Sequence, residues 1–183
     1  MKKLLVLIVI IIAGLGLYYF ERTKGTTSIN QNIKIQPSVE HPDATNATFI
    51  FEDGSIKLKN GKANTNIAGS SISVDTNLIE EPIAYADING DGKNDTIVIL
   101  SQDGGGSGIF VYLAAYVSGN VEYKGSNAVF IGDRVSPKSI TAGKDGIITF
   151  EYLDRNENDP MASEPTILKK TTFVWKNRIL EEI

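Results

Sequence analysis

The segment TFIFEDGSIKLKNGKAN, residues 48–64, contains three short runs in which apolar and polar residues alternate. Such alternation is typical of half-buried β-strands. The dipeptides Asp53-Gly54 and Asn60-Gly61 separate the runs, and both supply the positive φ angles that two-residue hairpin turns need. We therefore predict that the segment folds as an antiparallel β-meander.

The remainder of the chain after residue 46 follows the same pattern. Seven further runs are rich in β-branched and aromatic residues, as strands are: residues 71–75, 83–88, 96–100, 109–117, 127–131, 147–152 and 167–175. No window of a dozen residues shows a clear period of 3.6, so we expect little helix. The predicted fold is mainly β, a single antiparallel β-sandwich or barrel formed by residues 46–183, behind an N-terminal membrane-targeting helix.

Residues 1–22 differ in composition from the rest of the chain. Lys2 and Lys3 precede an unbroken run of apolar or small residues, residues 4–20, and a spanning helix needs at least about 17 such residues. A signal peptide has a similar basic start and apolar core, so cleavage after Gly16 is the alternative. Because the two lysines favour a cytoplasmic N-terminus, we expect residues 4–20 to anchor the chain in a bacterial cytoplasmic membrane. The domain then faces outward, toward the periplasm or the cell exterior, or is secreted if the segment is cleaved.

Residues 23–45 form a predicted polar linker. They are rich in Thr, Ser, Asn, Gln and Pro and show no sustained apolar period. The only histidine, His41, lies in this segment, and a single imidazole gives no pair of ligands for zinc. We expect His41 to be solvated and assign it no role.

The composition excludes several classes of function. The chain has 18 basic and 22 acidic residues, a formal net charge of −4, which gives no reason to expect a nucleic-acid partner. It has no cysteine, so disulfides, thiolate metal sites and cysteine nucleophiles are excluded. No G-x-S-x-G motif is present and the single histidine lies in the linker, so a serine hydrolase is excluded as well.

The stretch ADINGDGKNDTIVIL, residues 86–100, has the spacing of a calcium loop. Counted from Asp87, oxygen-bearing side chains fall at positions 1, 3, 5 and 9, and a glycine at position 6 allows the sharp turn. A set of hard oxygen ligands selects Ca²⁺ over the softer transition metals. The predicted metal ligands are the side chains of Asp87, Asn89, Asp91 and Asp95 and the backbone carbonyl of Lys93.

The end of this loop differs from an EF-hand. Position 12 is Val98 where an EF-hand has a bidentate glutamate, and a predicted strand follows where an EF-hand has a helix. The nine residues 87–95 resemble the D-x-N-x-D-G-x-x-D calcium loops of FG-GAP repeats, as in integrin alpha subunits. The motif occurs once, whereas a propeller needs at least about four blades, so the resemblance implies a calcium loop and neither the integrin fold nor adhesion. A solvated acidic turn is the alternative interpretation.

A glycine-rich segment, residues 101–108, follows the next strand. It lacks the lysine and the following helix of a phosphate-binding loop, so we expect a flexible hairpin loop beside the calcium loop. Asp103 in this segment is a candidate to reach the ion.

Two Asp-Arg pairs, Asp133-Arg134 and Asp154-Arg155, each follow a predicted strand. Functionally, two carboxylates at strand ends could form the acid and base pair that hydrolyses a glycan. The other interpretation is that each aspartate pairs with a neighbouring basic group and only ends its strand. The polar loop 154–165 is long enough to be a functional surface.

Three separated motifs, DINGDGKNDTIVILSQDGGGSG, SNAVFIGDRV and YLDRNENDPM, resemble a family of small exported bacterial proteins of unassigned function. The resemblance spans about residues 46–175, implies export and a compact domain, and carries over no catalytic residue. We expect a non-enzymatic, calcium-stabilised binding or envelope-accessory domain whose partner is an envelope protein or glycan. The alternative is a carboxylate-based hydrolase acting on envelope glycans.

Overall fold

The computed structural model describes residues 41–66, 69, 71–160 and 162–183. The predicted anchor, residues 1–22, and most of the predicted linker, residues 23–45, lie outside these residues. Within the described part of the chain, no helix combines the length and the apolar character needed to cross a bilayer.

The described residues are mainly β-structure with antiparallel sheets, which confirms the mainly β, antiparallel part of the predicted fold class. The elements are the 3-10 helix η1 (Ala44–Asn46) and the strands β1 (Thr48–Phe51), β2 (Gly54–Lys57), β3 (Lys62–Asn66), β4 (Ser73–Ala86), β5 (Asp95–Asp103), β6 (Ile109–Val117), β7 (Lys124–Gly125), β8 (Val129–Asp133), β9 (Ser136–Ala142), β10 (Ile147–Asp154), β11 (Ile167–Lys176) and β12 (Ile179–Glu182).

The strands form three sheets. β1 and β2 form a two-stranded hairpin, and β12, β11, β10 and β9 form a four-stranded sheet in that order. The third sheet has six strands: β3, β4, β5, β6 and β7 follow one another, and β8 also pairs with β6. β4 is one long strand that joins most of the two predicted runs 71–75 and 83–88, with a register shift between Ile79 and Ala84.

The first predicted hairpin turn is displaced by one residue. Phe51 pairs with Gly54, so Glu52 and Asp53 form the turn and Gly54 begins β2. Gly54 has a φ of 128°, a conformation open mainly to glycine. The glycine that we predicted in the turn is therefore needed one residue later, at the first position of β2.

The second predicted turn, Asn60-Gly61, is confirmed. The two residues have φ values of 52° and 77°, the pair of positive angles found in type I′ hairpin turns. Only one bridge, between Lys59 and Lys62, joins the flanking strands. β3 then pairs with β4, so the predicted meander is divided between two sheets.

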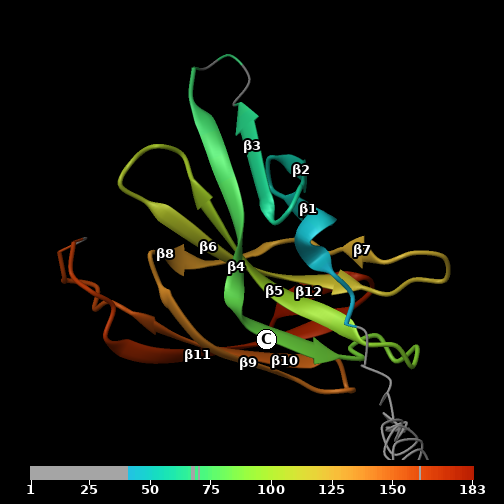
Figure 1. Ribbon diagram of the computed structural model, residues 1–183. Coiled ribbons are helices and arrows are strands. Elements are labelled where there is room, and N and C mark those ends of the chain that lie inside the picture. The colour runs from blue at the N-terminus through green and yellow to red at the C-terminus, as the bar shows by residue number, and fades with distance from the viewer. Residues whose placement is uncertain (1–40, 67–68, 70, 161) are drawn as a thin grey trace, which may run out of the picture. The chain divides into compact units, whose positions relative to one another are not determined.

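β5 lies at the centre of the domain and is buried on both faces. Ile97 and Ile99 belong to the main core, which the six-stranded and four-stranded sheets share, with Phe150 and Phe173 on the opposite side. Val98, Leu100 and other residues on the reverse face pack against the hairpin in a second core cluster. Figure 1 shows β9, β10 and β11 on one side of the central strands and β1 and β2 on the other. This layering is consistent with the predicted sandwich, with the hairpin as an additional cover.

The residues that precede β1 already contact the sheets. Thr96 Oγ1 donates a 2.6 Å hydrogen bond to the carbonyl of Pro42, and Ala44 is buried. The ring of His41 stacks on Tyr85 with centroids 3.7 Å apart. Residues 41–45, placed in the linker by composition, therefore pack on the domain. His41 is exposed, as expected, although its ring also stacks on Tyr85.

Burial of β5 on both faces leads to a stability prediction. Ile99→Ala and Leu100→Ala should each lower the free energy of unfolding by about 2–5 kcal/mol, because both side chains are 0% exposed although they point to opposite faces. Urea denaturation of the full chain in non-ionic detergent measures the loss. Leu168→Ala, at a residue that is 63% exposed, is the matched control and should change stability by less than about 0.5 kcal/mol. If Leu100→Ala lowers the free energy of unfolding by less than about 1 kcal/mol, the β1–β2 hairpin does not cover this face of β5 as described.

Candidate metal centre and the adjoining pocket

The predicted calcium loop connects β4 to β5. Gly90 and Gly92 have φ values of 77° and 87°, so the chain makes the sharp turn expected of a glycine at position 6. The carboxylate of Asp87 holds this turn in place, because it accepts hydrogen bonds from the backbone N–H groups of Gly90, Asp91 and Gly92 at 2.8–3.1 Å. The first predicted ligand therefore also shapes the loop.

Asp95 is the last predicted ligand, and it is 0% exposed. Its Oδ2 accepts a 2.9 Å hydrogen bond from Ile88 N, and its Oδ1 accepts a 2.8 Å hydrogen bond from Ser118 N. Burial raises the pKa of Asp95 above its ordinary value, although the hydrogen bonds from Ser118 and Ile88 act in the opposite direction. The charge of this carboxylate is therefore costly in the absence of a cation or a proton.

Ser118 joins two of the predicted ligands. Its Oγ lies 2.7 Å from Asp91 Oδ2 and 2.9 Å from Asp95 Oδ1. A hydroxyl has one proton to donate, and Asn89 Nδ2, at 3.1 Å, is itself a donor to the same oxygen. One of the two carboxylate contacts is thus left without a proton, so Asp91 and Asp95 share a single hydroxyl donor at Ser118.

The acidic loop is also bound to the segment that follows β6, residues 118–123. Asn89 Nδ2 donates a 2.8 Å hydrogen bond to the carbonyl of Ser118. The hydroxyl of Tyr123 donates to the carbonyl of Asn94 at 3.1 Å, and Lys93 Nζ lies 3.5 Å from the carbonyl of Gly119. The positions of the two segments are therefore coupled.

The five predicted ligands are close in the chain but do not all point to one centre. Asp91 and Asp95 meet at Ser118, whereas Asp87 and Asn89 are engaged with backbone groups of the loop and of Ser118. Among the described residues, no three His, Cys, Asp or Glu side chains are grouped so that they would hold a metal ion. Ser118 was not found from the sequence, because it is separated from the loop along the chain and belongs to no local motif.

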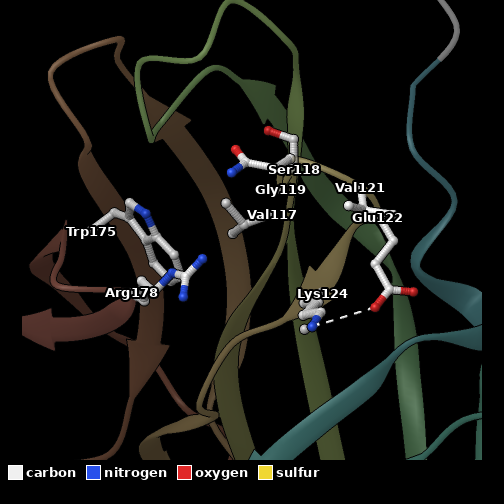
Figure 2. A pocket seen from close by; sticks show the side chains of 10 residues that line it. Val117, Ser118, Gly119, Val121, Glu122, Lys124, Trp175 and Arg178 are labelled. Carbon is white, nitrogen blue, oxygen red and sulfur yellow. Dashed lines mark ion pairs between the residues drawn. The ribbon is translucent and has the colours of Figure 1, made fainter.

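A pocket of about 530 Å³ adjoins this loop. It lies between the end of β6 with its following segment and the β11–β12 hairpin, and Figure 2 shows Trp175 and Arg178 on one side and Glu122 and Lys124 on the other. The lining residues are Val117, Ser118, Gly119, Asn120, Val121, Glu122, Lys124, Gly125, Trp175 and Arg178. Ser118 thus belongs both to the acidic cluster and to the pocket wall.

The glycine-rich segment lies elsewhere. β5 extends to Asp103, which pairs with Ile109, so the hairpin loop is residues 104–108, at the opposite end of β5 from the acidic loop (Figure 1). The carboxylate of Asp103 accepts a 2.8 Å hydrogen bond from Gly105 N. The prediction that this loop lies beside the calcium loop is wrong, because the strand between them is longer than the sequence pattern indicated.

Asp133 and Asp154 are paired with basic groups. Arg134 donates two hydrogen bonds to Asp133, at 2.8 and 3.0 Å, and these, opposed by burial and helped by Ile109 N, hold the pKa of that carboxyl below its ordinary value. Burial raises the pKa of Asp154, but the 2.7 Å hydrogen bond from Lys169 Nζ and that from Arg155 N outweigh it, so the net pKa is lowered. Neither carboxyl is adapted to hold a proton at neutral pH, as the acid of a glycosidase must.

Neither Asp133 nor Asp154 lines the pocket beside the acidic loop or the smaller cavity of about 310 Å³ near Phe110 and Tyr112. Instead, Arg155 Nη2 donates a 2.6 Å hydrogen bond to the carbonyl of Asp133, which attaches the loop after β10 to the end of β8. The two Asp-Arg pairs therefore have an evident role in joining loops to the sheets.

No family model, curated protein or solved structure matches this chain. The resemblances to FG-GAP loops and to small exported bacterial proteins stay expectations, and the functional argument rests on the residues themselves.

The paired state of Asp133 predicts a pH-dependent contribution to stability. Its pKa is lowered in the folded domain from an unfolded value of about 3.9, so its contribution is present above that pH and is lost as the pH falls through the folded pKa. Asp133→Asn should cost about 1 kcal/mol at pH 7 and less near pH 2.5, measured by urea denaturation. Glu181→Gln, at an exposed position on β12, is the control and should have little effect at either pH. An equal loss at both pH values would show that the charge of Asp133 is unimportant.

Proposed function

We propose that the protein is a non-enzymatic, calcium-stabilised binding domain, tethered on the outer side of a bacterial cytoplasmic membrane. The approach of the Asp91 and Asp95 carboxylates to one hydroxyl group, that of Ser118, is the observation that carries this proposal. A cation would relieve the repulsion between two carboxylates that share one hydroxyl proton, and carboxylate oxygens are ligands that Ca²⁺ prefers.

The residues of the loop fit such an ion in their chemistry. Asp91 and Asp95 would contribute carboxylate oxygens, and Asp87 and Asn89 lie in the same loop with oxygens of the same type. Burial raises the pKa of Asp95, so a cation beside its carboxylate would offset the cost of the buried charge.

The contacts of Ser118 suggest what the ion would stabilise. Ordering of Asp91 and Asp95 would fix Ser118, and with it the segment 118–123 that forms much of the pocket wall. The ion would therefore reduce the entropy lost when a ligand enters the pocket. The hydrolase alternative is less well supported, since Asp133 and Asp154 are both paired with cations and lie outside the pocket.

Calcium should raise the melting temperature of the full chain in non-ionic detergent. With 10 mM Ca²⁺ and a dissociation constant of the order of 10⁻⁴ to 10⁻³ M, the stabilisation is about 1.4–2.7 kcal/mol, or roughly 5 °C. Magnesium should do much less, because it demands a more regular shell. Differential scanning calorimetry in calcium, magnesium and chelator measures the effect.

Two variants distinguish calcium binding at the loop from a general effect of acidic charge on the melting temperature. Asp91→Ala should remove the calcium-dependent part of the shift and leave the chelated protein about as stable as before, because Asp91 is exposed. Asp103→Ala removes an acidic side chain at the other end of β5 and should leave the calcium shift unchanged. Identical melting curves of the unmodified chain in calcium and in chelator would mean that the loop is only a solvated acidic turn.

The membrane tether is the part of the proposal that concerns residues 1–22. Fractionated cells should contain the full-length chain in the membrane fraction, with the domain accessible to protease from outside, because residues 4–20 are long enough to span and lack a convincing cleavage site. N-terminal sequencing of the recovered protein is the check. A mature N-terminus at Leu17 would leave a secreted domain in place of an anchored one.

A further inference from the structure

Two hairpin turns in this domain have almost the same backbone but different residues. Asn60-Gly61 has φ values of 52° and 77°, and Asn177-Arg178, between β11 and β12, has φ values of 52° and 68°. Glycine is preferred at the second position because a Cβ atom is sterically strained in the left-handed region. The chain uses glycine in the first turn, so the arginine in the second turn has no explanation in the turn itself.

The side chain of Arg178 lines the pocket beside the acidic loop. Within the described residues, no carboxylate forms an ion pair with it. The pocket has one acidic side chain, Glu122, and this is 3.4 Å from Lys124, as the dashed line in Figure 2 marks. The positive charge of Arg178 is therefore not neutralised within the pocket, although the chain as a whole is acidic.

The other pocket residues offer surfaces of a different kind. Trp175 and Val117 present apolar groups to the cavity, and Val121, at its rim, is 96% exposed. The side chain of Asn120 makes no hydrogen bond with the described residues, so its amide has both donors and an acceptor to offer. A ligand with a flat apolar ring face, hydrogen-bonding groups and an anionic group would therefore find a partner for each of them, in Trp175, Asn120 and Arg178.

We propose that this pocket binds an acidic sugar unit. The C–H face of the pyranose ring would lie on Trp175, the hydroxyl groups would meet the amide of Asn120, and the carboxylate or phosphate would pair with Arg178. The proposal names the ligand class of the binding domain proposed above and rests on that function. A strained turn residue that carries the charge of the site is in keeping with the storage of strain at functional positions.

Arg178→Gly tests the proposal in two ways, because it should raise the stability of the domain and lower its affinity for an acidic sugar. The melting temperature should rise by roughly 2–4 °C, since glycine relieves the turn, as in Asn60-Gly61. Affinity for an acidic sugar should fall about tenfold or more, since a charge-assisted hydrogen bond is lost. Lys138→Ala, on the exposed surface of β9 at the far edge of the four-stranded sheet, removes one positive charge outside the pocket and should leave affinity unchanged.

Fluorescence reports directly on this pocket, because Trp175 is the single tryptophan of the chain. The full chain in non-ionic detergent with 10 mM calcium is titrated with a hyaluronan tetrasaccharide, and chitotetraose is the neutral control ligand. We expect saturable change with the acidic tetrasaccharide and at least tenfold weaker response with the neutral one. Equal response to both sugars, no response to either, or unchanged affinity in Arg178→Gly would overturn the proposal.

The calcium proposal can fail separately. A calcium-dependent melting temperature without acidic-sugar binding would refute the ligand class and leave the calcium-stabilised domain intact. Acidic-sugar binding that depends on Arg178 but is unchanged in chelator would support the ligand class and remove calcium from the binding function.

Discussion

The structure depends on the buried strand β5 and on the carboxylate of its first residue, Asp95. Residues 95–100 of β5 are all buried, and the strand has a core on each face. Its first residue is Asp95, whose carboxylate must find partners because no water reaches it. The partners are Ile88 in the acidic loop and Ser118 after β6. Satisfying one buried charge thus determines how the loop before β5 lies against the segment that forms the pocket.

Local patterns were sufficient to predict much of the fold. The Asn60-Gly61 turn and the limits of β6 were as expected, because a turn dipeptide and a continuous apolar run are properties of adjacent residues. β9 was missed because it contains Pro137 and Lys138 among small polar residues, as an edge strand often does. β4 was divided in two because Glu80-Glu81-Pro82 interrupts its apolar pattern, although pairing with β5 resumes afterwards. Pairing between distant segments overrides the local pattern at these points.

Only the part of the candidate site that is formed by neighbouring residues of the chain was predictable from the sequence. The acidic loop is a run of nearby residues and its spacing is visible in the sequence. Ser118, Trp175 and Arg178 come from β6 and the β11–β12 hairpin, and only the packing of two sheets brings these segments to one place. The same reason applies to Asp133 and Asp154, whose role the sequence leaves open. The sequence does not show that Lys169 reaches the carboxylate of Asp154 or that Arg155 reaches the carbonyl of Asp133.

The point at which the chain enters the domain has a mechanical consequence. Thr96, directly after Asp95, holds the carbonyl of Pro42, so the incoming segment is fastened to the start of β5 beside the acidic loop and the pocket wall. A pull on the chain before His41, resisted by a ligand in the pocket, would load the hydrogen bonds of Thr96, Asp95 and Ser118. The same incoming segment continues into β1, so the hairpin that covers the reverse face of β5 would share this load.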